Sequence, residues 1–501
     1  DSISITRAAG EGKGTYVITP SANSTEGNYS LNFVNGTFEV YAAETLLIRV
    51  AGDSKIYGST VPTFTATEAK YVTAGNELKT LTLTSTGANS YDYDDGLGTT
   101  GSFKLTSPAG NLSNVGNYDI TVTDFTQTGA NFSTQKTQTG NLVINPYVVS
   151  LTGSRSYDGT ANVAAGKFTM NPLVNSQTLT LSGSGTVASR NVGSSLAVTI
   201  GTLALGNDTG LASNYTLSGG THQATITRAD LTISTPNVTK IYDGNTTAAG
   251  TATATAGTVF AGDSLSGGTF TFDNKNVGAG NKTVTVSGVT VNDGNAGGNY
   301  NVTYASNTTS TITPKTVIAG GITASHRTYD GTTNATVSAA GATLTGKVEG
   351  DDLSINTVTG AFANKHVGNA KTVTLATTYV GDDKGNYTLV DQAAATANIY
   401  KADLTLSTPN ITKIYDGNTT AAGTASATSG TVFAGDSLSG GTFTFDNKNA
   451  GAGNKNVTVS GVTLTDGNAG GNYNVTYASN TTSTINPYAV SLTGTRVYDG
   501  T

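Results

Sequence analysis

Short segments in which apolar and polar residues alternate recur along the whole chain. Such a period of two is typical of half-buried antiparallel strands. Turn clusters rich in asparagine, aspartate and glycine separate the segments. Six or seven short strands at this spacing predict a two-sheet sandwich of the immunoglobulin-like type, with a small barrel as the alternative. Within residues 230–314 the clearest segments are 231–233, 269–272, 282–286, 300–304 and 310–312.

A Tyr-Asp-Gly motif recurs and sets the periodicity of the chain. A trimmed form, Lys55-Ile56-Tyr57-Gly58, precedes the full copies. An Asn-Tyr pair follows each complete motif, and its tyrosine lies 58 residues after the motif tyrosine, as from 157 to 215. The full copies are Tyr157-Asp158-Gly159, Tyr242-Asp243-Gly244, Tyr329-Asp330-Gly331, Tyr415-Asp416-Gly417 and Tyr498-Asp499-Gly500, and the second tyrosines are Tyr215, Tyr300, Tyr387 and Tyr473.

Successive motif tyrosines lie 83 to 87 residues apart, which is the size of an autonomous domain and not of a solenoid repeat. We therefore predict tandem domains. Residues 230–314 and 402–487 are close copies of each other, separated by one diverged domain. We expect both ends of the chain to be cut inside a repeat. The predicted boundaries are 1–42 (the C-terminal part of a truncated repeat), 43–146, 147–229, 230–314, 315–401, 402–487 and 488–501 (the start of a further repeat).

The composition narrows the class of protein further. Only 12% of the residues are charged, glycine is abundant, and threonine and valine favour strands, which predicts an all-β chain. The net charge of −7 argues against nucleic acid as a partner. No apolar run approaches the roughly 20 residues of a membrane-spanning helix. The absence of cysteine excludes disulfides and thiolate metal sites.

The motif residues have a structural interpretation and a metal-binding one. In the first, the tyrosine packs at one end of the sandwich, the aspartate caps a turn, and the glycine takes a positive φ. In the second, Asp243 binds calcium with Asp263, Asp273 or Asp293. One or two carboxylates fall short of the 6 to 8 oxygens that calcium takes. The structural interpretation is therefore favoured, and no cofactor is expected. The better calcium candidates are Asp94-Asp95, Asp351-Asp352 and Asp382-Asp383.

Two further motifs are interpreted as structural. A basic residue followed by Asn-Val-Gly, as at Lys275-Asn276-Val277-Gly278, is expected to be a turn with a solvated lysine, and an isopeptide crosslink is the less favoured alternative. Gly262-Asp263-Ser264-Leu265 recurs in two other domains but is missing near Ser176, so we do not expect it to carry essential chemistry. No triad or pair of catalytic carboxylates is recognisable, and an enzyme is not expected.

Together these motifs resemble the YDG repeat of giant bacterial surface proteins, and the trimmed motif with Gly116-Asn117-Tyr118 resembles the related MBG repeat, an immunoglobulin-like module. The resemblance implies a region of a filamentous-haemagglutinin-like adhesin, exported by two-partner secretion to the bacterial outer surface. It supplies no catalytic residues. The implied role is a stalk for cell–cell, biofilm-matrix or host attachment. The alternative is a set of repeats that bind exopolysaccharide or host glycans weakly and gain by avidity.

The junctions between repeats contain no Gly/Ser linker, and Pro146, Pro314 and Pro487 restrict the backbone at three of them. We therefore expect tandem immunoglobulin-like domains that form an extended, semi-rigid and monomeric rod. At about 30 to 40 Å per domain, the chain would reach on the order of 150 to 200 Å.

Overall fold

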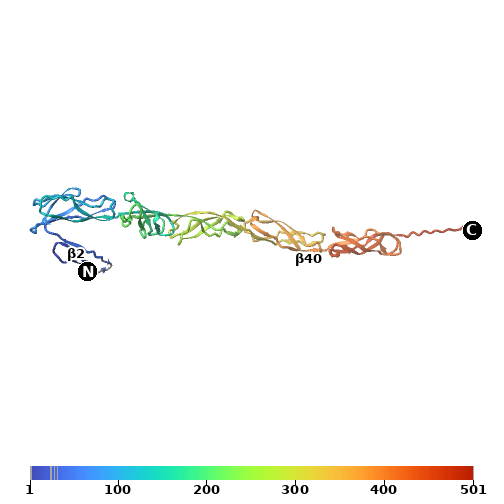
Figure 1. Cartoon of the computed structure of the whole chain (residues 1–501). Helices are drawn as coiled ribbons and strands as arrows, with labels where there is room; N and C mark the ends of the chain where they lie inside the picture. Colours follow the sequence, from blue (N-terminus) through green and yellow to red (C-terminus); the bar gives the residue numbers. More distant parts are fainter. Residues whose placement is uncertain (1–2, 23–24, 27–28, 31, 500–501) are drawn as a thin grey trace. The chain divides into compact units, whose positions relative to one another are not determined.

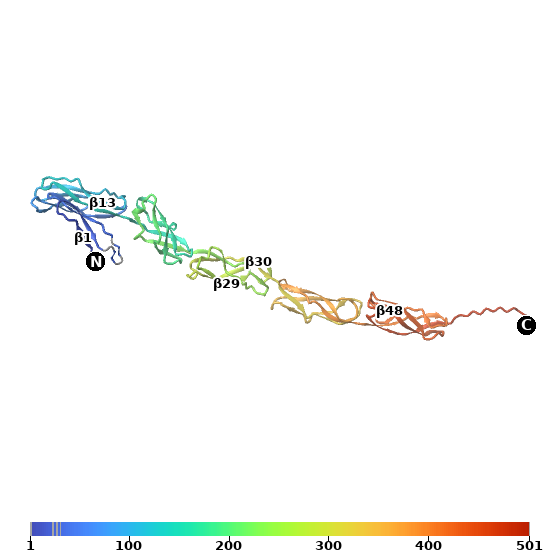
Figure 2. The same ribbon diagram turned by 60° about the horizontal axis from the view of Figure 1, so that its bottom comes forward.

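The computed structural model describes residues 3–499 except 23–24, 27–28 and 31, so Gly500 of the last motif copy lies outside the described residues. The described chain consists of strands, short 3₁₀ turns and loops, with no α-helix (Figure 1 and Figure 2). By its contacts the chain forms two compact units. The first comprises the residues up to Leu231 together with Gly257–Ser264 and Val291–Val302, and the second comprises the remainder. The all-β prediction with tandem repeated domains is confirmed.

The N-terminal residues form a small antiparallel sheet of order β1-β2-β5, next to a two-stranded ribbon of β3 and β4. The strands are β1 (Ser4–Arg7), β2 (Gly14–Ser21), β3 (Thr25–Glu26), β4 (Tyr29–Ser30) and β5 (Gly36–Val40).

Residues 43–146 contain a four-stranded sheet of order β14-β6-β8-β9 and a six-stranded sheet of order β10-β11-β12-β13-β15-β7. Their core includes the fully buried Leu46, Ile48, Leu105, Ile120 and Leu142. The strands are β6 (Thr45–Val50), β7 (Asp53–Ile56), β8 (Ala66–Val72), β9 (Leu78–Thr80), β10 (Thr82–Gly87), β11 (Ser90–Asp94), β12 (Thr100–Thr106), β13 (Gly116–Thr123), β14 (Thr134–Gln138) and β15 (Gly140–Asn145).

The domain at 147–229 has a main sheet of order β18-β21-β22-β25-β17-β19 and two strand pairs, β16-β24 and β20-β23. Its elements are β16 (Tyr147–Val148), β17 (Leu151–Ser156), β18 (Asn162–Ala164), η1 (Ala165–Lys167), β19 (Phe168–Met170), η2 (Val174–Ser176), β20 (Leu179–Ser182), β21 (Ser184–Val187), β22 (Gly193–Thr199), β23 (Ala204–Asn207), η3 (Ala212–Asn214), β24 (Tyr215–Thr216) and β25 (His222–Thr227).

Residues 230–314 form sheets of order β28-β26-β31 and β27-β32-β30-β29. All five alternating segments named in the sequence lie in their strands. These are β26 (Ala229–Ser234), β27 (Thr239–Ile241), β28 (Thr253–Ala256), β29 (Ser264–Phe272), β30 (Gly278–Asn292), β31 (Tyr300–Tyr304) and β32 (Asn307–Thr313).

The last two domains repeat this plan. The sheets at 315–401 have the orders β38-β33-β41, β34-β37 and β35-β42-β40-β39-β36, and those at 402–487 have the orders β46-β43-β49 and β44-β50-β48-β47-β45. The elements are β33 (Lys315–Gly320), β34 (Thr323–Ala324), β35 (Arg327–Thr328), β36 (Asn334–Ala335), β37 (Val337–Ser338), β38 (Thr343–Thr345), β39 (Ser354–Phe362), β40 (Gly368–Val380), η4 (Asp382–Asn386), β41 (Tyr387–Val390), β42 (Ala395–Tyr400), β43 (Ala402–Ser407), β44 (Thr412–Ile414), β45 (Thr420–Ala421), β46 (Ser426–Ser429), β47 (Ser437–Phe445), β48 (Gly451–Thr465), β49 (Tyr473–Tyr477) and β50 (Asn480–Asn486).

The alternation alone predicts antiparallel strands, but some of the strand pairs are parallel. In the domain at 315–401 the first strand β33 pairs in parallel with β41, and β35 pairs in parallel with the last strand β42. The same two parallel pairs occur at 402–487, between β43 and β49 and between β44 and β50. Because the first and last strands run in the same direction, the chain enters such a domain at one end and leaves it at the other. We call these the proximal end and the distal end.

Candidate functional site

The motif tyrosine lies at the distal end of its domain because the strand before it pairs with the last strand. The N–H of Tyr329 donates to the carbonyl of Tyr400, directly after the parallel pair of β35 and β42. The N–H of Tyr157 likewise donates to Thr227 at the end of β25. Both rings are about 1% exposed, whereas Tyr415 of the last complete domain is 36% exposed. The motif tyrosine is thus buried where a further described domain follows.

The second tyrosine of each unit lies at the opposite, proximal end, where β41 begins beside β33. The two tyrosines separated by 58 residues therefore do not meet. Four motif tyrosines instead contact the second tyrosine of the following domain: Tyr57, Tyr157, Tyr242 and Tyr329. The ring centroids of Tyr157 and Tyr300 lie 5.3 Å apart, and those of Tyr329 and Tyr473 also lie 5.3 Å apart, both edge to face. We number the four junctions by the motif tyrosine: first (Tyr57), second (Tyr157), third (Tyr242) and fourth (Tyr329).

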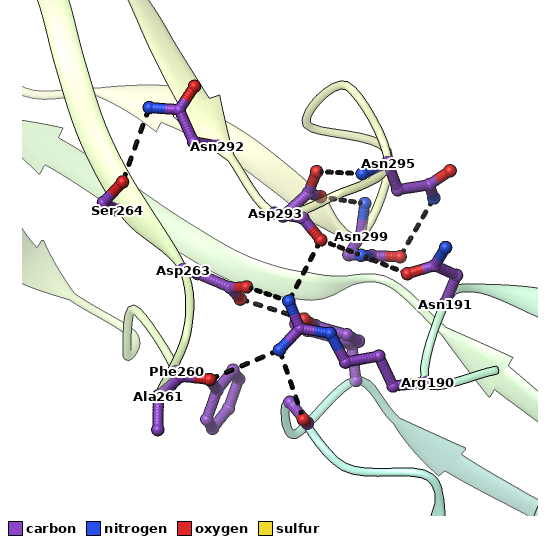
Figure 3. Close-up of polar contacts among 12 residues, drawn as sticks. Arg190, Asn191, Phe260, Ala261, Asp263, Ser264, Asn292, Asp293, Asn295 and Asn299 are labelled. Carbon is purple, nitrogen blue, oxygen red and sulfur yellow. Dashed lines mark hydrogen bonds and ion pairs between the residues drawn. The ribbon is translucent and has the colours of Figure 1, made fainter.

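In the second junction both tyrosine hydroxyls donate to one buried carboxylate. The hydroxyls of Tyr157 and Tyr300 lie 2.9 and 2.7 Å from Oδ2 of Asp263. Nη2 of Arg190, from the domain of Tyr157, donates to Oδ1 of Asp263 at 2.7 Å (Figure 3). The Asp263 side chain is 0% exposed. A carboxylate excluded from water in this way needs a cation and hydrogen-bond donors, and the junction supplies both.

An asparagine links the same two domains beside the carboxylate. Oδ1 of Asn299 accepts the backbone N–H of Val192 at 2.9 Å, and its Nδ2 donates to Oδ1 of Asn191 at 3.1 Å (Figure 3). The backbone N–H of Asn299 is held by Oδ2 of Asp293, a buried carboxylate that also accepts N–H groups from its own loop. The Asn-Tyr pair therefore places two adjacent side chains toward the preceding domain.

The third junction repeats this network with one more carboxylate. Asp351 accepts hydrogen bonds from the hydroxyls of Tyr242 and Tyr387. Nζ of Lys275 lies 2.9 Å from Oδ1 of Asp351 and 3.1 Å from Oδ1 of Asp383. Oδ1 of Asn386 accepts the N–H of Val277 at 3.0 Å.

The fourth junction has the same arrangement with a single carboxylate. Oδ2 of Asp436 accepts the hydroxyls of Tyr329 at 2.8 Å and Tyr473 at 2.7 Å. Nζ of Lys365 lies 2.8 Å from Oδ1 of Asp436, whose side chain is 0% exposed. Oδ1 of Asn472 accepts the N–H of Val367 at 3.0 Å.

The first junction has the same arrangement of two tyrosines and an asparagine, but its acceptor side chain is neutral. The hydroxyls of Tyr57 and Tyr215 donate to Oε1 of Gln177, at 3.2 and 2.6 Å. The N–H of Val115 donates to Oδ1 of Asn214 at 2.8 Å. Ser113 occupies the position, two residues before the valine, that holds Arg190 in the second junction. A neutral amide thus takes the place of the aspartate.

The protonation equilibria follow from these contacts. Burial by itself raises the pKa of Asp436, but hydrogen bonds from Lys365, Tyr473 and Tyr329 outweigh it and lower the pKa below the ordinary value. The pKa of Asp351 is lowered in the same way against the effect of burial. Burial, followed by the bond to Asp263, raises the pKa of Tyr157 to about 12. At neutral pH the third and fourth junctions therefore hold an ionised carboxylate, Asp351 and Asp436, and the hydroxyl of Tyr157 in the second junction is neutral.

The motif aspartate and glycine have separate tasks. Oδ1 of Asp243 accepts Nζ of Lys240 at 2.6 Å and the N–H of Asn245 at 3.2 Å, within one domain. Gly331 has a φ of +78°, and a Cβ added there would lie 2.8 Å from Cβ of Phe433 in the next domain. The glycine therefore serves both the turn and the close approach of the neighbour.

The structure corrects two expectations from the sequence. The sequence predicts a solvated lysine in this turn, but Lys275 of Lys-Asn-Val-Gly and Lys365 of Lys-His-Val-Gly pair with buried carboxylates of the next domain. The Gly-Asp-Ser-Leu motif was set aside because one domain lacks it. Its aspartate is the acceptor of the junction, and the domain that lacks it uses Gln177. The sequence contains a signal for this contact, because Gln177 replaces the aspartate and Ser113 replaces the cation in the same junction.

Three of the calcium candidates, Asp95, Asp351 and Asp383, have other partners. In the pair Asp351-Asp352, the first carboxylate holds Lys275, which also contacts Asp383. Asp95 accepts N–H groups from Leu97 and Thr99 and the hydroxyl of Tyr71. Within the described residues no group of three or more His, Cys, Asp or Glu is arranged to hold a metal ion.

Among the described residues no helix is both long enough and apolar enough to cross a membrane.

The fold and the junctions define a protein built from tandem β-domains that dock in series through one repeated polar contact. The sequence matches the YDG domain family over residues 141–224, 227–309, 313–397 and 400–484, which is more than half of the chain. The chain therefore belongs to the YDG domain family. Residues 1–39 match the MBG domain family of the YGX type. The assignment of 43–146 as MBG-like stays a prediction.

The chain matches no curated protein. Among solved structures it is similar to the Escherichia coli adhesin FdeC, at 15% identity over 52% of this chain and 98% of that chain, with a TM-score of 0.14. It is also similar to the surface layer protein SbsC, domains 1–6, at 11% identity over 85% of this chain and 64% of that chain, with a TM-score of 0.13. Agreement at this level carries no argument about function.

Proposed function

We propose that this chain is a stalk segment of a secreted bacterial cell-surface adhesin, which projects a binding region for cell–cell, biofilm-matrix or host attachment. The observation that carries the proposal is the repeated junction. In each of the four, tyrosines from two successive domains bind one side chain, and an asparagine binds the backbone of the preceding domain. The tandem YDG domains and their resemblance to repeats of bacterial surface proteins support the same role.

A stalk needs a fixed step from one domain to the next, and these junctions restrict that step. Buried hydrogen bonds and ion pairs tolerate little displacement, because a buried polar group that loses its partner costs about 1–3 kcal/mol or more. Each domain has its own buried residues, such as Phe445 and Ile485 in the last complete one. A second buried cluster runs across the fourth junction, from Phe362 and Ile399 to Leu404 and Tyr473, so apolar contacts also restrict that step. The rod is proposed to be monomeric and semi-rigid.

Small-angle X-ray scattering of the full chain tests this proposal. We expect a maximum dimension on the order of 150 to 200 Å, as about 30 to 40 Å per domain requires. Replacing the three junction aspartates by alanine (Asp263→Ala, Asp351→Ala and Asp436→Ala together) should broaden the distance distribution while the strand content measured by circular dichroism stays constant. A compact particle in the unmodified chain would contradict the proposal.

A second candidate function is weak binding of polysaccharide along the array. One observation favours it: Tyr304 and Tyr477 occupy matching positions in the two near-identical domains, and each ring is 43% exposed. Exposed tyrosines at a regular spacing could stack on sugar rings and gain by avidity. Binding of the full chain to a panel of bacterial and host polysaccharides, with and without calcium, tests this. The double variant Tyr304→Ala/Tyr477→Ala should bind more weakly than Tyr400→Ala, a matched exposed tyrosine in the intervening domain.

A further inference from the structure

Two positions change together from one junction to the next. The first position lies two residues before the valine whose backbone N–H donates to an asparagine of the next domain. The second position holds the side chain that accepts hydrogen bonds from both tyrosine hydroxyls. In the second, third and fourth junctions the pair is a cation with aspartate. In the first junction both members are neutral. The pairs, from the first junction to the fourth, are Ser113 with Gln177, Arg190 with Asp263, Lys275 with Asp351, and Lys365 with Asp436.

Each matched pair satisfies its own hydrogen bonds. Gln177 accepts both hydroxyls through Oε1, and its Nε2 lies 3.1 Å from the hydroxyl oxygen of Tyr57. Asp436 has two oxygens, and it uses one for the tyrosines and the other for Lys365. A mismatched pair would leave either a carboxylate without its cation or a cation against a neutral amide. A buried charge without a partner is strongly destabilising.

The charge of a junction does not follow from its apolar packing. The motif glycine of the first junction, Gly58, faces Val174, and Gly244 of the third junction faces the matching Val348. The first junction is neutral and the third is charged, although both have valine there. The second and fourth junctions are charged with Phe260 and Phe433 in this place. The polar pair therefore varies independently of the side chain beside the glycine.

We propose that these two positions form a pairing rule that decides which domain can dock on which. A distal end that carries a cation accepts a proximal end with aspartate, and a neutral distal end accepts one with glutamine. The rule goes beyond the stalk function, because it specifies the order of the domains and disfavours docking out of order. It does not depend on whether the array also binds a ligand.

The distal end of the domain at 402–487 also has a residue at the cation position. Lys448 lies two residues before Ala450, which matches the valine position, and within the described residues Lys448 is exposed and makes no ion pair. Beside it, Tyr415, Gly417, Asn449 and Tyr488 line a recess of about 610 Å³.

The test uses the full chain and a reporter at each junction. The N–H groups of Val115, Val192, Val277 and Val367 each donate to an asparagine across one boundary, so their hydrogen-exchange rates report opening of the four junctions separately. Three variants are compared at the first junction: Gln177→Asp, Ser113→Lys, and the two together. The other three valines serve as controls within the same molecule.

Gln177→Asp alone should raise the exchange rate of Val115 by about tenfold to a hundredfold, because it buries a carboxylate without a cation. Adding Ser113→Lys should return the rate to within about threefold of the unmodified chain, since the pair then matches the other junctions. The rates at Val192, Val277 and Val367 should not change. If the effects of the two substitutions on Val115 simply add, with no rescue, the rule is wrong.

The reverse substitutions at the fourth junction provide a second test, which does not depend on correct folding of the first junction. Asp436→Gln should raise the exchange rate of Val367, and Asp436→Gln with Lys365→Ser should recover protection. Failure of both pairs to show rescue would overturn the rule without affecting the stalk proposal, which the scattering experiment tests on the unmodified chain.

Discussion

The first and fourth junctions place the same two tyrosines around different chemistry. Tyr57 and Tyr215 bind the neutral amide of Gln177, and Tyr329 and Tyr473 bind the ionised Asp436 with Lys365 beside it. The edge-to-face contact of the rings is nearly the same, with centroids 5.5 and 5.3 Å apart. The comparison teaches that the tyrosine geometry positions the domains, while the acceptor and its cation determine how the junction responds to mutation, pH and salt.

Removal of the acceptor should give the largest difference between the two junctions. Asp436→Ala leaves Lys365 and two tyrosine hydroxyls without their partner, and we expect the fourth junction to lose about 2–3 kcal/mol, near the low end for a buried pair because Lys365 can reach water. Gln177→Ala should cost the first junction about 1–2 kcal/mol, since no charge is left unpaired. Exchange rates at Val367 and Val115 measure the two losses, and equal losses would contradict the comparison.

A smaller effect should follow from adding one methyl group at the motif glycine. Gly331→Ala meets both a φ of +78° and the Cβ of Phe433, whereas Gly417→Ala meets a φ of +84° with nothing within 4 Å. Both variants should strain their own turn by about 1 kcal/mol. Only Gly331→Ala should also raise the hydrogen-exchange rate of the Val367 N–H. The thermal unfolding of the two variants separates the shared strain from loss of docking, and an unchanged rate at Val367 would show that the approach of Phe433 is not needed.

Acid should weaken the third and fourth junctions and spare the neutral first junction. The pKa of Asp436 is lowered in the folded chain, so its contribution is fully present above the ordinary value of 3.8 and is lost as the pH falls through the lowered pKa. The same holds for Asp351. Between pH 5 and pH 2 we therefore expect exchange at Val367 and Val277, corrected for the intrinsic rate, to rise relative to Val115. A constant ratio over this range would mean that the carboxylates do not stabilise docking.

Salt should produce the smallest effect. Raising the ionic strength from 0.1 to 1 M shortens the screening length from about 10 to 3 Å, which weakens exposed charge pairs more than buried ones. Lys275 has a side chain 36% exposed, and Lys365 has one 25% exposed. We expect exchange at Val277 to rise by about twofold, at Val367 by less, and at Val115 not at all. A rise at Val115 equal to that at Val277 would point to a general effect of salt on the domains.

Local sequence patterns were enough to predict the strands and the repeats. The alternation in 282–286 and 300–304 and the constant spacing of the tyrosines predicted β-domains of this size, and the structure has them. The parallel pairing of β33 with β41 could not be predicted, because alternation does not encode the direction of the partner strand. The type of sandwich and the extended rod stay predictions.

The site was harder to predict because its members lie in different domains. Tyr157 and Asp263 are 106 residues apart, and no local motif links them. The constant interval between Tyr157 and Tyr215 spans one domain, and the two tyrosines lie at its opposite ends. Arg190 lies in the type of turn for which a solvated cation is predicted, and its acceptor Asp263 belongs to the next repeat. Comparing the repeats position by position would have revealed the link, since Ser113 and Gln177 change together.

The most direct test of the central claim is the exchange rate of the four reporter amides in the unmodified chain at neutral pH. Val115, Val192, Val277 and Val367 lie outside strands, and each donates to an asparagine of the following domain. The account predicts that all four valine N–H groups exchange at least about tenfold more slowly than the amides of an unstructured peptide, because docking of the domains protects them from solvent. Exchange of all four at the rate of free amides would show that the junctions are open in solution and would contradict the account.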